Sequence, residues 1–348
     1  MMDNVTVITM LTLSGLNGTA NYRVTLFAVT VLCYCVILLV NVTIIATIIG
    51  DKSLHEPMYI FLCNLCINGL YGTAGFYPKF LHDLLSSTQV ISHAGCLLQG
   101  FVLHSSATAD FSLLALMAYD RYVAICRPLM YHSVMTKQRI SLFVFFAWFV
   151  PFFLMFLSTI TSTSRLCGSN IPKIYCVNWF INSLACSASI AANVIPGFNY
   201  TFYTGHAVFV VWTYIYMLKT CLKSKDDMNR FMQTCLPHMF CVTIFTVSLL
   251  FDLLYMRIGS KDLSQNVQNF MAIEFLLIPP IINPLIYGFK LTKIRKRIMT
   301  VSTVLYKYGA LKNIHEYTLA KPWIQQSQDE YREHGSPRRL NGAKHSSV

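Results

Sequence analysis

Charge is scarce in this chain of 348 residues. Asp, Glu, Lys and Arg together make up 12% of it, whereas a soluble domain carries about twice that share. Hydrophobic residues make up 55%. This composition excludes the ordinary soluble class of protein and indicates a protein whose surface faces lipid.

Charges are almost missing from seven long apolar stretches. Each has about 20 or more residues and is long enough to cross a hydrocarbon core of ~30 Å as a helix. None shows an alternation of period two, which excludes the strands of a membrane barrel. The sequence therefore predicts an all-α membrane protein, a seven-helix bundle over residues 24–289. The expected spans are residues 24–49, 58–80, 97–119, 140–163, 195–218, 236–256 and 268–289.

Lys and Arg are distributed unevenly between the two ends of these spans. With the N-terminus outside, the inner segments hold fourteen of them and the outer segments hold six. The positive-inside rule therefore places the N-terminus outside the cell. The net charge of +12 is then a topology signal and an attraction to anionic inner-leaflet lipid, and it does not indicate nucleic-acid binding.

The segments that flank the bundle are polar. Residues 1–23 are expected to form an extracellular tail without a cleavable signal peptide, and they hold two glycosylation acceptors, Asn4 and Asn17. Residues 290–302 place apolar and basic side chains on opposite faces, which predicts a short amphipathic helix on the cytoplasmic side. Residues 303–348 are expected to be a disordered cytoplasmic tail.

Four of the twelve cysteines fall in the expected outer segments. An even outer set suggests two disulfides, with three connectivities open. A disulfide from the first of them would staple the loop at about residues 164–194 across the outer mouth of the bundle. The loop could simply be stabilised in this way, or it could form a lid over a ligand cavity, and the two roles are compatible. The four are Cys96, Cys167, Cys176 and Cys186.

An acid and a base stand side by side where the third span meets water. The stretch from Cys96 to Met117 contains no Lys or Arg, and Asp120 and Arg121 follow it within the sequence MAYDRYVAIC. A charge pair at such a position can be held as an ion pair or released. This pattern indicates a signalling receptor, although many inner-edge arginines are simple topology anchors.

Seven spans, this MAYDRYVAIC element and the sequence NPLIY near the end of the seventh span resemble the rhodopsin-like G-protein-coupled receptors. Four further elements resemble the olfactory receptor branch over about residues 20–300. They are LHEPMYIFLCNL at Leu54–Leu65, the three-cysteine outer loop, Thr234, Cys235 and His238 at the start of the sixth span, and PPIINPLIYG at Pro279–Gly288. The stretch INGLYGTAGFYPKF resembles fish members of the family, which favours an aquatic odorant.

The resemblance implies a receptor, not an enzyme, that binds a small odorant on the outer side of the bundle. It would activate a stimulatory heterotrimeric G protein and raise cyclic AMP, in the plasma membrane of olfactory neuron cilia. The alternative is a secondary transporter or channel, for which internal repeats or paired broken helices would be expected; the sequence shows neither. An enzyme is less favoured, because no nucleophile, base or metal-ligand cluster stands out.

The resemblance also implies roles for individual residues. Asp120, Arg121 and Tyr122 would form the switch that couples to the G protein, and Pro284 would let the seventh helix bend so that Tyr287 can move. Bending alone is the simpler interpretation of this second element, which also includes Asn283, and the two interpretations are compatible. The implied disulfides are Cys96–Cys176 and Cys167–Cys186.

Asp110 lies near mid-membrane, and an acid in that position indicates a functional site. The resemblance implies a sodium-binding or proton-sensitive pocket with Asn283 nearby. Glycine at position 69 stands where the family usually has a second acid, which halves the charge of that pocket. A neutral, hydrogen-bonded Asp110 that stiffens the core is the alternative. No other cofactor and no other metal is expected.

The ligand cavity is expected between the third, fifth, sixth and seventh spans, below the disulfide-held loop. Its expected lining is mostly apolar, which suits a small organic odorant. Arg257 at the rim and His104 in the wall favour a small anionic or strongly polar odorant. Arg257 could also be an edge residue that reaches the headgroups, and His104 a packed core residue. The expected lining residues are Leu103, His104, Ala107, Thr108, Phe202, His206, Leu249, Leu253, Arg257 and Ile273.

Overall fold

The computed structural model describes residues 8–187, 190–222 and 265–290, together with 228, 231, 235–236, 239–243, 245–247, 293–300 and 303. The chain divides into two units, Met1–Arg295 and Lys296–Val348. The second unit is described only at 296–300 and 303, which are helical. Residues 293–300 thus form helix within the range expected for the amphipathic helix, and the rest of the expected tail lies outside the described residues.

Six long helices occupy the described part of the first unit, and each overlaps one of the expected spans. Most of the expected sixth span, 236–256, lies outside the described residues, but those described within it are helical. By length and apolarity, three described helices could cross a membrane: Ala20–Gly50, His93–Cys126 and Lys137–Thr161. The long helices are α1 (Arg23–Gly50), α2 (Pro57–Leu85), α3 (His93–Cys126), α5 (Lys137–Thr161), α7 (Ile190–Cys221) and α9 (Gln265–Lys290).

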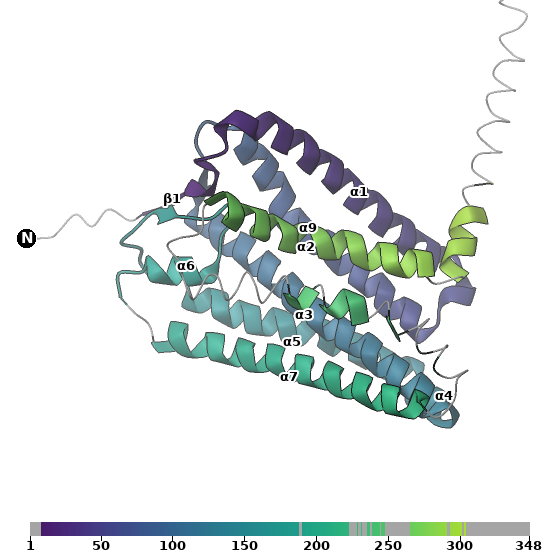
Figure 1. Cartoon of the computed structure of the whole chain (residues 1–348). Coiled ribbons are helices and arrows are strands. Elements are labelled where there is room, and N and C mark those ends of the chain that lie inside the picture. The colour runs from purple at the N-terminus through teal and green to yellow at the C-terminus, as the bar shows by residue number, and fades with distance from the viewer. Residues whose placement is uncertain are drawn as a thin grey trace, which may run out of the picture. The chain divides into compact units, whose positions relative to one another are not determined.

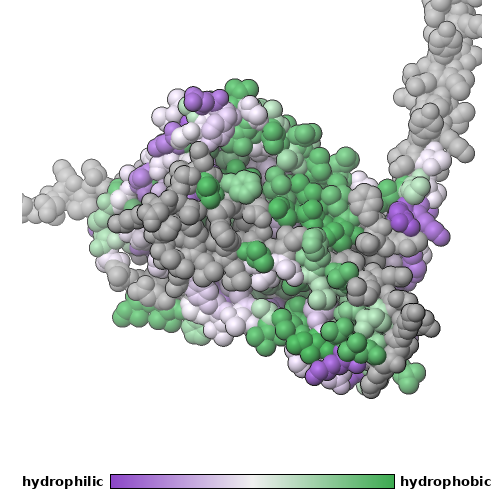
Figure 2. Space-filling view, viewed as in Figure 1, coloured by the Kyte–Doolittle hydropathy of each residue, from purple (hydrophilic) through white to green (hydrophobic). Residues whose placement is uncertain are grey.

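The central element is α3, which packs against α2, α5 and α7, while α1 packs against α2 and α9 (Figure 1). In α3, 78% of the most apolar 18-residue segment is buried inside the bundle. In the corresponding segments of α1 and α5 the buried share is 22%. The outer helices therefore direct large apolar side chains outward, such as Leu39 and Phe145. Figure 2 shows hydrophobic surface over α1. An apolar exterior is what helices in contact with lipid require.

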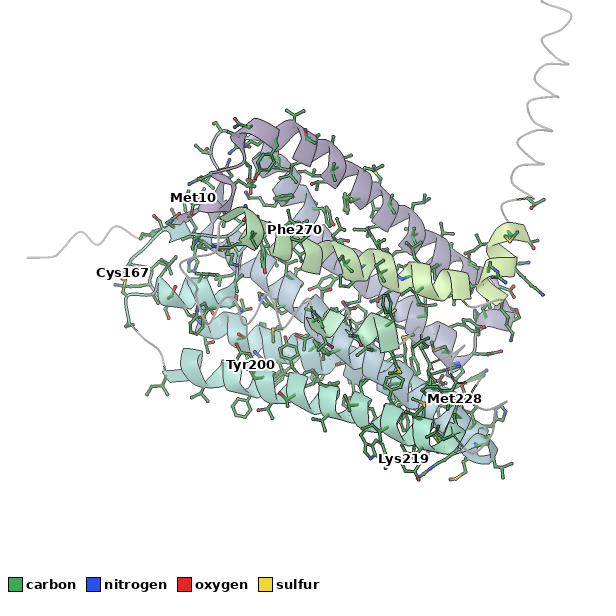
Figure 3. All side chains as sticks on the ribbon, in the orientation of Figure 1. Met10, Cys167, Tyr200, Lys219, Met228 and Phe270 are labelled. Atoms are coloured by element: carbon green, nitrogen blue, oxygen red, sulfur yellow. A yellow bond between two sulfur atoms is a disulfide. The ribbon has the colours of Figure 1, made fainter. Side chains whose placement is uncertain are left out.

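Helix boundaries follow from local capping. Ser92 Oγ accepts a hydrogen bond of 3.1 Å from the amide of Gly95 at the start of α3, and Pro57 occupies the first position of α2. The turns η3 (Lys52–Leu54) and η4 (Pro128–Met130) and the short helix α4 (Tyr131–Val134) connect the long helices. Figure 3 shows Cys167, in the loop after α5, and Lys219, near the end of α7, at opposite ends of the helices, consistent with an outer and an inner end of the bundle.

A small three-stranded sheet lies at the outer end of the helices. The sequence did not predict this sheet. Strand β1 (Met10–Leu13) pairs antiparallel with β2 (Val90–Ser92) and parallel with β3 (Asn170–Ile171). Leu11 and Leu13 of β1 are buried, so the expected outer tail forms part of the core at this end. The turns η1 (Ser14–Leu16) and η2 (Ala20–Tyr22) and the helix α6 (Asn178–Ser183) complete this region.

Of the two glycosylation acceptors, Asn17 is exposed beside the sheet, and Asn4 lies outside the described residues. Thr19, the hydroxyl residue of the Asn17 triplet, is buried and donates a hydrogen bond of 2.8 Å to the carbonyl of Leu16. Glycosylation at both positions stays a prediction.

Candidate functional site

The inner end of α3 carries a buried ion pair. Asp120 is fully buried, and its Oδ2 accepts a hydrogen bond of 2.9 Å from Nε of Arg121 and a second one from the same guanidinium. The side chain of Arg121 is 19% exposed, so the pair lies where the effective dielectric is low and the attraction is strong. In this arrangement Arg121 is held by its neighbour.

A loop residue adds a third contact to this pair. Tyr131, the first residue of α4, donates a hydrogen bond of 2.8 Å to Oδ1 of Asp120. Burial and the negative charge of Asp120 raise the pKa of Tyr131 above its ordinary value, so the phenol stays a neutral donor at physiological pH. Both carboxylate oxygens are therefore occupied. Tyr131 was not predicted as a site residue, because a lone tyrosine in the connection between two helices gives no periodic signal.

Tyr122 does not take part in the ion pair. Its buried ring packs against Trp212 and Tyr216 of α7, with ring centroids 5.5 and 5.6 Å away. The guanidinium of Arg127 lies 5.8 Å from the centroid of the Tyr122 ring. Tyr122 therefore links α3 to α7 at the same end as the ion pair.

The expected bend element lies on α9. Asn283 and Pro284 are buried, and the helix contains two further prolines, Pro279 and Pro280. Each proline removes one backbone donor from the helix. The side chain of Tyr287 lies outside the described part of the chain, so the proposed movement of Tyr287 stays a prediction.

Asp110 is buried in the middle of α3 and is held by a residue that sequence analysis did not single out. Asn68 Nδ2 donates hydrogen bonds of 2.7 Å to Asp110 Oδ1 and 2.8 Å to the carbonyl of Ser106. Asp110 and Gly69 line the same small cavity of about 30 Å³, and Asn283 is not among its lining residues.

The described residues expected to line a ligand pocket fall in different places. Leu103 and Ala107 line the small cavity beside Asp110. Phe202 and His206 line a larger cavity of about 670 Å³ formed by residues of α3, α5 and α7. Neither of these two cavities, as far as described residues line them, includes all four side chains, and the expected ligand pocket stays a prediction.

The other two expected lining residues of α3 are His104 and Thr108. His104 Nδ1 is 2.7 Å from the carbonyl oxygen of Gly100, so this nitrogen carries the hydrogen and donates it. Thr108 Oγ1 donates to the carbonyl of His104 and lies 2.8 Å from the hydroxyl of Tyr203. Ile273 packs against a buried hydrophobic cluster that includes Leu16, Phe76 and Tyr175. Leu249, Leu253 and Arg257 lie outside the described residues.

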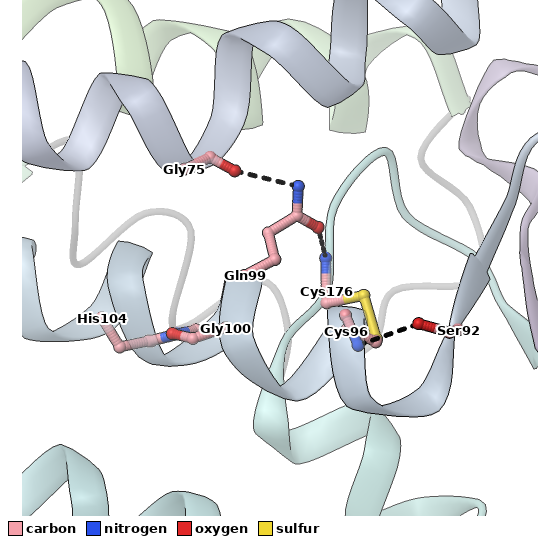
Figure 4. The surroundings of a disulfide bond; sticks show 8 residues. Gly75, Ser92, Cys96, Gln99, Gly100, His104 and Cys176 are labelled. Atoms are coloured by element: carbon pink, nitrogen blue, oxygen red, sulfur yellow. Dashed lines mark hydrogen bonds between the residues drawn. A yellow bond between two sulfur atoms is a disulfide. The ribbon is translucent and has the colours of Figure 1, made fainter.

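The outer loop is attached to α3 by one disulfide and a side-chain bridge (Figure 4), and a second disulfide closes the loop on itself. The structure joins Cys96 to Cys176 and Cys167 to Cys186, the pairs that the family resemblance implies. Gln99 accepts a hydrogen bond of 3.0 Å from the amide of Cys176 and donates one of 3.2 Å to the carbonyl of Gly75. Sequence analysis missed Gln99, which connects α2, α3 and the loop.

Comparison with known proteins supports one family. Residues 30–304 match the family model described as olfactory receptor. The olfactory receptor-like protein COR2 of Gallus gallus is 31% identical over 315 residues, which cover 86% of this chain and 98% of the relative. Human olfactory receptor 6C1 is 31% identical over 86% of this chain and 97% of its own length, and mouse olfactory receptor 6E1 is 31% identical over 85% and 95%.

The matches confirm the predicted family, the seven-helix membrane fold and the non-enzymatic class, and they remove the transporter alternative. The relatives named above come from chicken, mouse and human, so the fish-type subtype stays a prediction. A multi-pass plasma-membrane protein with this match over most of its length is a G-protein-coupled receptor for odorants: the chain belongs to the olfactory receptor family.

Proposed function

We propose that this receptor binds its odorant on the outer side of the bundle and activates a stimulatory heterotrimeric G protein, raising cyclic AMP in olfactory cilia. The observation that carries the coupling mechanism is the contact set at the inner end of α3, where Asp120 holds Arg121 and accepts from Tyr131. A guanidinium held in this way is blocked from an outside partner until the contacts break. Once released, its planar fork of donors can bind backbone carbonyls of a G protein.

An odorant drives this release only if it binds the active conformation more tightly than the resting one. The odorant site is proposed at the end where the loop is fastened by Cys96–Cys176 and Gln99. Arg121 is 25 residues after Cys96, which is ~37 Å along a helix. Ligand binding and G-protein binding would therefore be coupled through the length of α3.

Replacing Arg121 by alanine tests the coupling role. Arg121→Ala is expected to reach the cell surface and bind ligand but to lose ligand-dependent cyclic AMP accumulation. The matched control is Arg139→Ala, because Arg139 is also basic and lies at the inner end, but among the described residues its guanidinium donates to the carbonyl of Ser133 and forms no ion pair. Normal cyclic AMP signalling from well-expressed Arg121→Ala receptor would show that the ion pair is not the switch.

We also propose that the odorant is small and anionic or strongly polar, such as a short acid. His104 lies on α3 eight residues inward of Cys96, about 12 Å along the helix. Arg257, which the sequence places at the outer end of the sixth span, supplies the countercharge in this proposal. A guanidinium matches the two oxygens of a carboxylate.

A sodium ion near Asp110 is proposed as a modulator. Within the described part of the chain, the buried side-chain oxygens Asn68 Oδ1 and Asn41 Oδ1 have no hydrogen-bond partner, and the Asp110 carboxylate lies beside Asn68. Carboxylate and amide oxygens are the ligands that hard cations prefer. Asp110 and Asn68 would hold the ion, with Asn41 near Gly69. Asn283, expected nearby, does not line the described cavity.

A further inference from the structure

A third cavity opens at the inner edge of the bundle, and its lining includes neither Arg121 nor any of the residues expected to bind the odorant. It has a volume of about 550 Å³ and is lined by residues of α1, α2 and α5 and of the turn before α2. It lies where α1 ends at Gly50, α2 begins at Pro57 and α5 begins at Lys137. The outside N-terminus of the receptor fold places this end at the cytoplasmic leaflet.

The residues that line this groove change from basic at the inner edge to mainly apolar deeper in the bundle. On α5, Lys137, Ile140 and Val144 follow helical spacing, so they share one face, with the ammonium at the inner edge and Val144 ~10 Å deeper. His55 lies at the same inner edge, in the turn before α2, and Ile60 continues the apolar part on α2. The groove therefore has a basic rim and a mostly apolar interior, which also holds Asn64 and Ser141.

The basic rim is not neutralised by neighbouring acids. Among the described residues, no Asp or Glu lines the groove. The two acids nearest in sequence to His55 are engaged elsewhere: Glu56 bonds Lys293 at 2.7 Å, and Asp51 accepts from the amide of Ser53 at 3.0 Å. An anion at the rim would therefore meet the Lys137 ammonium with no groove-lining carboxylate beside it among the described residues.

The amide side chain of Asn64, which lines the interior, already forms hydrogen bonds within the bundle. Asn64 accepts a hydrogen bond of 3.1 Å from Nε1 of Trp148 and donates one of 2.9 Å to the carbonyl of Ile60. Each end of the Asn64 amide thus already has one partner within the bundle. An acyl chain requires no hydrogen-bond partner, and the bilayer supplies acyl chains at this depth.

We propose that this groove binds one anionic phospholipid of the cytoplasmic leaflet, with its phosphate at Lys137 and His55 and an acyl chain along Ile60, Ile140 and Val144. A phospholipid matches both halves of the lining, and the inner leaflet is the anionic one. The site is separate from the proposed signalling mechanism, so it stands or falls independently of cyclic AMP coupling.

The test uses the full-length receptor in nanodiscs that contain equal amounts of phosphatidylserine and phosphatidylcholine. Native mass spectrometry counts the copies of each lipid that stay bound. One phosphatidylserine is expected to remain preferentially on the wild-type receptor. Lys137→Gln should lower this preference about fivefold, the equivalent of the roughly 1 kcal/mol that one basic residue contributes near an anionic surface. Lys137→Arg should keep it.

Two further variants separate a defined site from general attraction to the membrane. Arg139→Gln removes the same charge two residues away, from a side chain that does not line the groove, and should leave the preference unchanged. Val144→Trp keeps the charges but fills the apolar part, and should displace the lipid. Equal losses in Lys137→Gln and Arg139→Gln, or full retention in Val144→Trp, would overturn the proposal.

Discussion

Asn41 of α1 donates a hydrogen bond of 2.9 Å from Nδ2 to the carbonyl oxygen of Pro280 in α9. In a regular helix this oxygen would accept from the amide four residues later, which here is Pro284 and has no hydrogen to donate. The asparagine therefore replaces the donor that the proline removes. It is a contact between the first and the last described long helix of the bundle.

Asn41→Leu keeps the approximate size of the side chain but leaves that partly buried carbonyl without its donor. We expect a loss of about 1–3 kcal/mol of stability, the usual cost of an unpaired buried polar group. The measurement is the melting temperature of purified receptor. Thr43→Val is the control, because the Thr43 hydroxyl bonds only its own helix at an exposed position. Equal melting temperatures for the two variants would contradict this role of Asn41.

Tyr131→Phe should raise ligand-independent signalling. The change removes the donor to Oδ1 of Asp120 while keeping the ring, and a hydrogen bond to a charged group contributes about 1.5–3 kcal/mol. If that contact exists only in the resting state, the population of active receptor rises about 10- to 150-fold, up to saturation. Basal cyclic AMP at matched surface expression is the measurement.

Tyr216→Phe is the matched control for this experiment, since its ring also lies near the inner end of α3 but no hydrogen bond of its hydroxyl is seen in the described residues. Because the pKa of Tyr131 is raised, its contact persists at all pH values below that raised pKa and is lost only as pH rises through it, above about 10. The basal activity of the wild type should thus show no dependence on this phenol between pH 6 and 8. Unchanged basal signalling in Tyr131→Phe would show that the contact does not hold the resting state.

The long helices were predictable because the signal for each is local. A run of about 20 apolar residues specifies a span without any knowledge of its partners. Strand β1 was missed for the opposite reason: its alternating buried residues Leu11 and Leu13 acquire meaning only through β2 and β3, which lie far along the chain. Four residues of alternation carry too little information to identify a strand alone.

The site shows the same division. Asp120 and Arg121 are adjacent in the sequence, so their pairing could be predicted, whereas the contact of Tyr131 with Asp120 depends on the course of the loop between α3 and α5. The expected ligand residues were chosen by depth along each span. Depth does not fix the rotation of a helix, so it could not predict that Phe202 and His206 line a cavity together with residues of α5.

Gly69→Asp should increase the response of the receptor to sodium. A side chain fits there, because a Cβ at position 69 would meet Asn41 Oδ1 at 3.5 Å and Pro280 Cβ at 3.7 Å, both ordinary contacts. A second carboxylate beside the cavity of Asp110 would bind a cation more strongly than one does. The measurement is the shift in odorant potency between sodium chloride and an equal concentration of choline chloride.

Gly69→Asn is the control for the sodium experiment, because it adds nearly the same volume without the charge. The shift should grow in Gly69→Asp and stay at the wild-type size in Gly69→Asn. The same salt response in all three receptors would argue against an ion pocket at Asp110.

Arg257→Ala should weaken responses to acidic odorants selectively. Removing the countercharge of a partly buried carboxylate costs roughly 2–3 kcal/mol, which lowers potency about 30- to 150-fold. Neutral analogues of the same size make no use of the charge and should keep their potency. Dose–response curves for an acid and its matched neutral analogue measure the difference, with Lys261→Ala as a second outer basic residue for comparison. If acid and analogue lose potency alike, Arg257 is an edge residue at the headgroups, and the proposal of an anionic odorant fails with it.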